Sequence, residues 1–354
     1  MKVVIAPDSF KGSISNVDAA AAIAEGWLAI RPKDEVIQKP MADGGEGTLE
    51  TIALQHPEAL RISCKLEHDS YWLLLPDGAA YVELASICGL TLQQVPDPMK
   101  AHTFELGEVL RQIASDERVN RIVLSVGGSA STDGGAGLLM ALGARLEDAN
   151  GEEIKRGGAG LTRLTKLDVS GVIAPPLGGV ACLSDVTNPL LGVIGSAAIY
   201  SPQKGANPEQ VAELARGLER LHRVSGKPDF LGAGAAGGTP YGLSIAWEVD
   251  IKSGALAVAE LIGLPEAIGA ADLVITGEGR LDAQSDFGKV VGTIAEIAKS
   301  KGREILYCVG SSAVEMGETG VALVDIAPSL NDAISDPRPW LIQAGRELAS
   351  RIKN

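Results

Sequence analysis

The chain opens with VVIAPDSFKGS at residues 3–13, and this stretch decides how the fold begins. Its first four residues are apolar and mostly β-branched, which is typical of a buried strand. Pro7 and Asp8 end the run, and residues 16–30 then place apolar residues at helical spacing. A strand, a loop and a helix in this order predict a unit of a parallel sheet.

The same order recurs twice further along the chain. Residues 121–126 form a second apolar run, which glycines and a helical pattern at residues 136–146 follow. Residues 272–276 form a third, followed by a loop, a helical pattern at residues 289–301 and an apolar strand at residues 304–309. Continuous apolar strands that alternate with helices predict a doubly wound α/β core, covered on both faces.

The stretches between these units have a different pattern. Residues 61–75 and 79–84 read as alternating segments on either side of a Pro-Asp-Gly turn, which predicts an antiparallel hairpin. Residues 208–224 predict an amphipathic helix within a segment rich in glycine and proline. We therefore expect a second α/β domain with a mixed sheet.

The composition narrows the class of protein. With 354 residues, 45% of them hydrophobic, the chain is long enough for two domains. A formal net charge of −14 argues against a nucleic-acid or anionic-membrane surface, since both need a basic footprint. Residues 1–6 lead straight into a turn and are too short for a signal peptide, so we expect none. No apolar stretch reaches the roughly 20 residues of a membrane span. We expect a cytoplasmic protein, monomeric or homodimeric, that binds neither nucleic acid nor membrane.

Four short clusters rich in glycine, acids and hydroxyls stand where a strand gives way to a helix. They read PDSFKGS at residues 7–13, ADGGEGT at 42–48, GGSASTDGG at 127–135 and TGEGRLD at 276–282. Glycine lets backbone N–H groups approach a ligand, and the helix that follows offers unpaired donors and a positive dipole end to an anion. Four such turns indicate one composite active site with phosphate chemistry.

Several common sites find no support. No segment supplies the GxxxxGK[ST] of a Walker A loop, and the first strand is not followed by the GxGxxG of a dinucleotide-binding fold. None of the four histidines lies in the glycine clusters, so a Ser-His-Asp or histidine–metal mechanism has no place there.

The first two clusters each allow two interpretations. Lys11 is a candidate contact for a phosphate or carboxylate, and the alternative is a solvated turn in which Ser13 or Ser15 caps the next helix. Asp43 and Glu46 amid glycines suit Mg²⁺, and the alternative is a helix N-cap by Asp43.

The third cluster gives the strongest single indication of anion binding, because consecutive backbone amides and hydroxyls form nests for phosphate oxygens. The alternative is a close-packed crossover. Asp185 is a candidate general base or metal ligand, or the start of an Asx-turn before Pro189. In the fourth cluster, Arg280 is shaped for bidentate recognition of a carboxylate.

Together these segments resemble the type-1 glycerate kinase family, and the match spans nearly the whole chain in order. The segments that carry it are residues 7–13, 42–48, 127–135, Asp185 with 188–192, 202–206, 232–238 and 275–282. The resemblance implies ATP-dependent phosphorylation of D-glycerate, to 2-phosphoglycerate, in glyoxylate- or glucarate-type catabolism. It also implies two α/β domains, one flavodoxin-like, with the active site in the cleft between them.

We expect the flavodoxin-like domain to comprise residues 1–54, 100–147 and 266–354, and the mixed-sheet domain residues 55–99 and 148–265. ATP is predicted to contact Gly127, Gly128, Ser129, Ser131, Thr132, Asp133, Gly134, Lys204, Gly277 and Glu278. Asp43 and Glu46 are the candidate Mg²⁺ ligands, and Asp8, Ser9, Lys11 and Arg280 the candidate contacts of glycerate.

Phosphoryl transfer needs positioning and charge neutralisation more than covalent chemistry. Lys11 and Arg280 are therefore predicted to clamp the carboxylate of glycerate, and Asp185 or Asp282 to accept the hydroxyl proton. One alternative is a kinase that forms 3-phosphoglycerate or acts on another small hydroxy acid. A second is a non-enzymatic sensor that binds a small anion.

Overall fold

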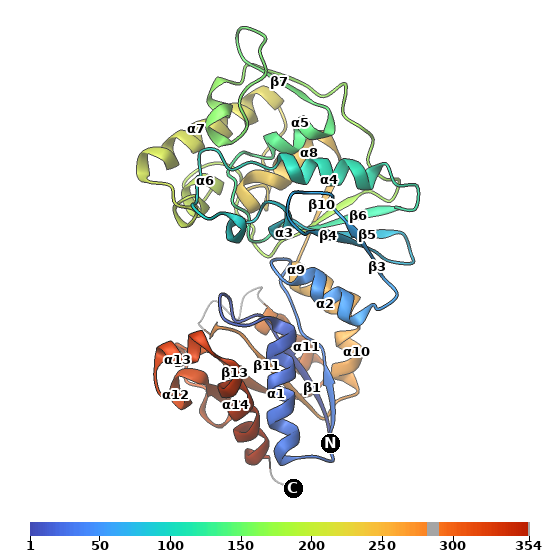
Figure 1. Ribbon diagram of the computed structural model, residues 1–354, viewed down its shortest axis with the longest axis vertical. Helices are drawn as coiled ribbons and strands as arrows, with labels where there is room; N and C mark the ends of the chain where they lie inside the picture. The colour runs from blue at the N-terminus through green and yellow to red at the C-terminus, as the bar shows by residue number, and fades with distance from the viewer. Residues whose placement is uncertain (282–289, 353–354) are drawn as a thin grey trace. The chain divides into compact units, whose positions relative to one another are not determined.

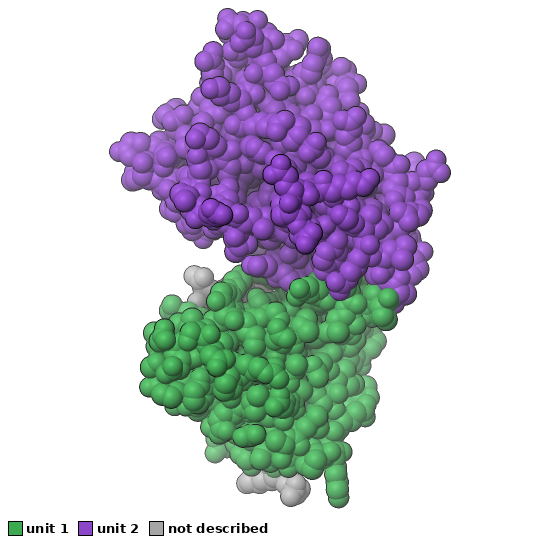
Figure 2. Space-filling view, viewed as in Figure 1, with its two compact units in different colours: residues 1–43, 50–57, 253–354 green, residues 44–49, 58–252 purple. Residues whose placement is uncertain are grey.

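The computed structural model describes residues 1–281 and 290–352. Figure 1 traces the chain, and Figure 2 colours its two compact units. Unit 1 consists of Met1–Asp43, Glu50–Pro57 and Ser253–Asn354, and unit 2 of Gly44–Leu49 and Glu58–Lys252. Each unit has its own sheet and its own apolar core.

Unit 1 is built on a five-stranded parallel sheet with the order β15-β13-β11-β1-β2. The strands are β1 (Lys2–Pro7), β2 (Glu35–Gln38), β11 (Leu273–Gly277), β13 (Glu304–Val309) and β15 (Gly320–Ala322). The chain moves outward from β1 to β2, returns to β11 on the other side of β1, and continues outward. This is the flavodoxin-like doubly wound order, with its switch point between β1 and β11.

Within the described residues, eight helices of unit 1 surround this sheet. One of them, α2, begins in unit 2 and continues into unit 1. They are α2 (Thr48–Gln55), α1 (Asn16–Ile30), α9 (Gly254–Leu261), α10 (Leu264–Gly269), α11 (Val290–Ser300), α12 (Leu323–Ile326), α13 (Leu330–Ser335) and α14 (Arg338–Arg351). Two short strands, β12 (Arg280–Leu281) and β14 (Ser311–Ser312), pair in parallel beside it, and a 3₁₀ turn covers Gly317–Thr319. The predicted helix at residues 16–30 and the predicted strand at 304–309 are confirmed.

Glycine allows the two long helices of unit 1 to pack closely. A Cβ on Gly26 of α1 would stand 2.0 Å from the carbonyl oxygen of Ile342 in α14, so only glycine fits there. Apolar side chains of both helices pack on Val3 and Ile5 of the sheet. Val4 is equally buried on the opposite face, because successive side chains of a strand point to opposite sides.

Unit 2 is built on a mixed six-stranded sheet with the order β10-β9-β6-β5-β4-β3. The strands are β3 (Leu60–Ser63), β4 (Tyr71–Leu74), β5 (Ala79–Glu83), β6 (Arg121–Ser125), β9 (Val180–Leu183) and β10 (Val249–Lys252). The predicted hairpin is confirmed, since β4 and β5 pair antiparallel around a turn at Gly78, whose φ is +80°. The fold class is confirmed as well: an α/β protein with one doubly wound parallel sheet and one mixed sheet.

The remaining elements of unit 2 cover this sheet or extend from it. The helices are α3 (Ala85–Cys88), α4 (Phe104–Ala114), α5 (Ala136–Leu142), α6 (Ser196–Tyr200), α7 (Pro208–Ser225) and α8 (Thr239–Ala246), with 3₁₀ turns at Leu90–Leu92, Gly158–Arg163, Pro202–Lys204 and Ala235–Gly238. β7 (Arg145–Glu147) and β8 (Lys166–Asp168) form an antiparallel pair. The predicted amphipathic helix is α7, whose first turn is closed by a capping box between Asn207 and Gln210.

The structure corrects one part of the predicted domain division. Residues 100–147 were expected in the flavodoxin-like domain, whereas they lie in unit 2, because β6 pairs with β5 and β9. The apolar run of β6 has the same pattern as β1 and β11, so the pattern alone does not tell which sheet it joins. Unit 1 also resumes at Ser253, earlier than the expected residue 266. Where independently folding domains begin and end stays a prediction.

Within residues 1–281 and 290–352, no helix has both the length and the hydropathy needed to cross a bilayer.

Candidate active site

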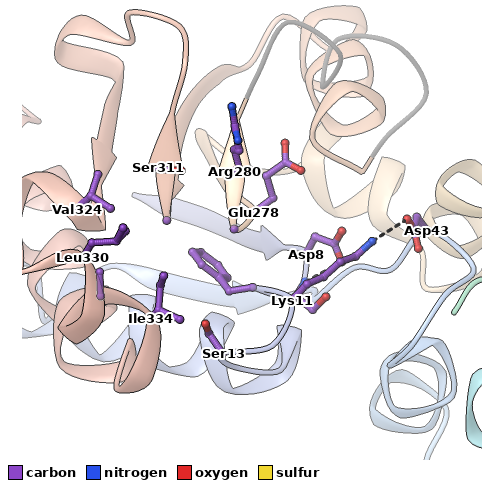
Figure 3. A pocket seen from close by; sticks show the side chains of 15 residues that line it. Asp8, Lys11, Ser13, Asp43, Glu278, Arg280, Ser311, Val324, Leu330 and Ile334 are labelled. Atoms are coloured by element: carbon purple, nitrogen blue, oxygen red, sulfur yellow. Dashed lines mark hydrogen bonds and ion pairs between the residues drawn. The ribbon is translucent and has the colours of Figure 1, made fainter. Parts of the chain in front are cut away.

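A pocket of about 440 Å³ opens in unit 1 at the carboxyl ends of β1 and β11 (Figure 3). Open α/β sheets bind their ligands at this place, outside the strand ends at the switch point. Five charged side chains line the pocket: Asp8, Lys11, Asp43, Glu278 and Arg280. They come from three of the four predicted clusters.

Backbone contacts fix the first and fourth clusters side by side. The N–H of Asp8 donates to the carbonyl of Gly277 at 2.8 Å, which continues the pairing of β1 with β11 past the sheet. A Cβ on Gly277 would lie 1.6 Å from the carbonyl oxygen of Cys308, so no larger residue fits between β11 and β13. Glycine at this position therefore serves close packing of strands, and it lets Glu278 enter the pocket directly after it.

The turn after β1 combines both interpretations of the first cluster. Phe10 and Ile14 pair across it, and Gly12 takes a φ of +76° at its tip. Ser15 caps α1, accepting a hydrogen bond from the N–H of Asp18 at 3.0 Å. Lys11 remains 81% exposed at the pocket. The cap and the candidate binding residue thus coexist within the same loop.

Asp43 reaches the pocket because the chain continues beyond β2 along the edge of β1. The N–H of Met41 donates to the carbonyl of Pro7 at 2.9 Å. The buried amide of Asn16 then donates to the carbonyl of Met41 at 2.6 Å, and to the hydroxyl of Thr51 at the same distance. This places the carboxylate of Asp43 3.9 Å from the ammonium of Lys11.

The pocket environment shifts the pKa of the Asp8 carboxyl. Asp8 is only 9% exposed. Burial raises the pKa of its carboxyl to about 7, and the negative charges of Asp43 and Glu278 also raise this pKa. The N–H of Ser9, at 2.7 Å, and the charge of Lys11 oppose this rise in pKa. A carboxyl with such a pKa exchanges protons near neutral pH, as a general base requires.

The other side of the pocket is apolar, and the sequence interpretation missed it. Its side chains are Phe10 from the first turn, Val324 from α12, and Leu330, Ala333 and Ile334 from α13. Leu330 and Ile334 are one helical turn apart, and this spacing was the only signal in the sequence that could have indicated a shared face. Figure 3 shows them away from Lys11 and Asp43.

The third cluster has a different environment in unit 2. Asp133 is fully buried, and its carboxylate accepts four hydrogen bonds of 2.9–3.1 Å. The donors are the N–H and hydroxyl of Thr103 and the N–H groups of Gly135 and Gly137. Asp133 therefore ties the loop to α4 and α5. The predicted contact of Asp133 with ATP stays a prediction.

Lys204 is also buried within unit 2, with 3% of its surface exposed. Its ammonium donates to the hydroxyl of Ser129 at 2.8 Å and to the carbonyl of Ser131 at 2.5 Å. Burial lowers the pKa of Lys204 to about 8, although the charge of Asp133 opposes the shift. Lys204 thus holds the loop in place, and its contact with phosphates stays a prediction.

The glycines of this loop allow close packing as well. A Cβ on Gly127 would meet the Cα of Gly45 at 2.6 Å. The N–H of Gly127 donates to the carbonyl of Gly44, and that of Gly134 to the carbonyl of Gly237. Ser131 and Thr132 are fully buried. These contacts favour the alternative interpretation, a close-packed crossover.

The remaining predicted residues fall in three places. Asp185 is half-buried after β9, and Glu46 is exposed in the segment 44–49 of unit 2. Asp282 lies outside the described residues. In unit 1, the structure brings together Asp8, Ser9, Lys11, Asp43, Glu278 and Arg280. Of the residues that the structure describes, no group of three His, Cys, Asp or Glu side chains is arranged to hold a metal ion by itself.

Comparison with known proteins gives one consistent family. A model described as the glycerate kinase family matches residues 3–353. A glycerate 2-kinase of Escherichia coli K12 is 39% identical over 335 residues, covering 90% of this chain and 87% of the relative. A glycerate kinase of Bacillus subtilis 168 is 35% identical, covering 100% and 98%. A crystal structure from Salmonella typhimurium LT2, of a protein assigned as glycerate kinase 2, has a TM-score of 0.79 at 34% identity, covering 99% and 97%.

Proposed function

Since this chain belongs to the glycerate kinase family and is a kinase, we propose that it transfers the γ-phosphoryl group of ATP to D-glycerate, giving 2-phosphoglycerate and ADP. The observation that carries the proposal is the pocket of unit 1, where two cations and three carboxylates meet at the switch point of a doubly wound sheet. Relatives named glycerate kinase and glycerate 2-kinase support the substrate.

The step requires a proton acceptor. The hydroxyl oxygen of glycerate forms a bond to the γ-phosphorus, the bond from that phosphorus to the oxygen it shares with the β-phosphate breaks, and the hydroxyl proton leaves. Asp8 is our proposed acceptor, because a pKa of about 7 matches a general base at neutral pH. Asp185, at the end of a strand in unit 2, and Asp282, outside the described residues, keep their predicted role as alternative acceptors.

Lys11 and Arg280 are our proposed clamp for the glycerate carboxylate. Both are exposed where they line the pocket, so their charges are available to a ligand. Arg280 offers a planar fork that matches two carboxylate oxygens, and Lys11 adds a point charge. Ser9, in the same turn, offers a hydroxyl beside them.

The pocket also suits magnesium bound together with a nucleotide. Asp8, Asp43 and Glu278 are close enough that their charges raise the pKa of Asp8, and a divalent cation would offset this repulsion. Among the described residues, no group of three His, Cys, Asp or Glu side chains could hold the ion alone. Phosphate oxygens and water would therefore complete the coordination shell of the ion, as Mg²⁺ prefers. The bound ion would neutralise charge on the phosphates. Asp43 stays our first candidate ligand, and Glu46, three residues further along the chain, the second.

The glycine-rich loop of unit 2 contributes differently from the prediction. We propose that Asp133 and Lys204 hold this loop in position. We also propose that the small residues of the loop give it the shape needed beside the nucleotide: Gly127, Gly128, Ser129, Ser131, Thr132 and Gly134. Gly277 and Glu278 keep their predicted place beside the nucleotide. On the strength of the family resemblance we also propose cytoplasmic action in glyoxylate- or glucarate-type catabolism, as a monomer or homodimer.

The test is ³¹P NMR of the purified protein with D-glycerate and MgATP, without coupling enzymes. A 2-phosphoglycerate resonance supports the proposal, whereas 3-phosphoglycerate keeps the reaction and corrects the hydroxyl. Phosphorylation of another acid in a panel of small hydroxy acids would replace the substrate. If no acid is phosphorylated and one binds tightly, the protein is a sensor and the proposal fails.

A further inference from the structure

The pocket of unit 1 has an apolar side that the small acid does not explain. D-Glycerate is a three-carbon acid with polar groups on every carbon, so it has no surface to place against apolar side chains. A cavity of about 440 Å³ falls in the range of roughly 300–1,000 Å³ that holds ligands the size of a nucleoside or larger. A second, larger ligand group is needed to fill it.

The apolar side is formed by Phe10, Val324, Leu330, Ala333 and Ile334, which we call the apolar wall. Leu330 is 62% exposed and Ile334 is 51% exposed, and both line the pocket from α13. Two large apolar side chains exposed at helical spacing toward one cavity present surface that a ligand can cover. Phe10, only 3% exposed, adds an aromatic ring.

The charged side of the same pocket suits what is attached to a nucleoside. Lys11 and Arg280 offer positive charge to phosphate oxygens as well as to a carboxylate, and Asp43 and Glu278 would offer oxygen atoms to an accompanying Mg²⁺. Figure 3 shows Val324, Leu330 and Ile334 away from Lys11 and Asp43. A molecule with an apolar aromatic end and an anionic end fits this division.

In the glycine-rich loop of unit 2, several polar groups are already used within the unit. Its buried charges, Asp133 and Lys204, are hydrogen-bonded within the unit, and the N–H groups of Gly127 and Gly134 already have backbone acceptors. Backbone amides that are used inside the protein are not available to a phosphate.

From these observations, and resting on the proposed kinase function, we infer that the apolar wall of unit 1 binds the adenosine moiety of ATP. The ring system covers Leu330 and Ile334, and the phosphates extend toward Lys11, Arg280 and the carboxylates. The nucleotide and glycerate then share one end of the pocket, where the γ-phosphoryl group must meet the hydroxyl.

The test compares two probes, MgADP and magnesium tripolyphosphate, by isothermal titration calorimetry on the full chain. The variant is Leu330→Gln/Ile334→Gln, since glutamine keeps helix propensity and volume and both positions are more than half exposed. Leu256→Gln on α9, where Leu256 is 45% exposed outside the pocket, is the matched control. We expect MgADP to bind roughly tenfold more weakly to the double variant and unchanged to the control. Tripolyphosphate should bind all three proteins alike.

Unchanged binding of MgADP to the double variant, or no binding to the natural protein, would overturn the inference. A raised KM for glycerate with unchanged MgADP affinity would do so too, because the wall would then serve the acid. Photolabelling with 8-azido-ATP gives an independent reading: label on residues 323–335 supports the site, and label on residues 126–135 overturns it. Since calorimetry and photolabelling need no turnover, failure of glycerate phosphorylation in the NMR assay is distinguishable from failure of this site.

Discussion

The turn after β1 in unit 1 and the glycine-rich loop after β6 in unit 2 follow parallel strands in the same way, yet their charged residues have opposite surroundings. In the first, Lys11 is 81% exposed and Asp8 lines a pocket. In the second, Asp133 is fully buried and Lys204 is 3% exposed, and both are hydrogen-bonded internally. Two glycine-rich turns with similar sequences therefore differ in whether their charged side chains line a cavity or are enclosed by internal hydrogen bonds.

Replacing aspartate with asparagine should lower activity in the first loop and stability in the second. The larger effect is expected for Asp8→Asn. We expect kcat for glycerate phosphorylation to fall by about 10²-fold or more, because the proposed base can no longer accept a proton. Steady-state kinetics measures this, with Asp325→Asn, an exposed carboxyl on α12, as the control. A kcat within threefold of the natural protein would remove Asp8 from the reaction and leave Asp185 or Asp282 as the acceptor.

Asp8→Asn should leave the fold intact, and this can be checked without magnesium. Because burial raises the pKa of Asp8 above its ordinary value of 3.8 to about 7, the folded state binds more protons than the unfolded chain between these pH values. Its contribution to the free energy of unfolding therefore falls as pH rises from about 4 to 7. In urea titrations, the free energy of unfolding of Asp8→Asn should rise relative to that of the natural protein as the pH increases across that window.

Asp133→Asn should instead damage stability. The amide group of asparagine would turn a donor toward N–H groups that now donate to the carboxylate, leaving buried donors without acceptors. We expect the free energy of unfolding to fall by about 3 kcal/mol in urea titrations. The KM values for both substrates should change less than twofold in the molecules that remain folded. A normal stability with a raised KM for ATP would instead restore the predicted role of Asp133 in nucleotide binding.

The smallest expected effect concerns Lys204 and pH. Because its pKa in the folded protein, about 8, is below the ordinary 10.5, the unfolded chain binds more protons between these values. The free energy of unfolding that Lys204 contributes therefore rises with pH across that window. The difference between the natural protein and Lys204→Met should widen by about 1 kcal/mol from pH 8 to 9. Lys299→Met, at an exposed position, should show no such change, and a constant difference for Lys204 would contradict its burial as an ammonium.

Much of the fold could be predicted from local pattern. The helix at residues 16–30, the strand at 304–309 and the hairpin around Gly78 depend on apolar spacing and turn residues within short windows, and the structure confirms them. The assignment of residues 100–147 failed because β6 repeats the pattern of β1, and strand partners are chosen by contacts between distant segments.

The candidate site was predictable to a similar degree. Asp8, Lys11, Asp43 and Arg280 were found because acids and cations beside glycine, directly after strands, are unusual unless they serve a ligand. The apolar wall was missed because Leu330 and Ile334 look like ordinary helix residues until the cavity beside them is known. The internal hydrogen bonds of Asp133 and Lys204 were not predicted, because burial cannot be read from residue type.

The sequence by itself determined the strands, the main helices, the turns that need glycine, and the family to which the chain belongs, because each depends on local spacing or on residues in a fixed order. Tertiary structure alone decided which strands share a sheet, and which of two similar glycine clusters exposes its charges. Those outcomes depend on what distant segments bring alongside: Thr103 and Gly137 donate to Asp133, whereas the groups around Asp8 leave a cavity open.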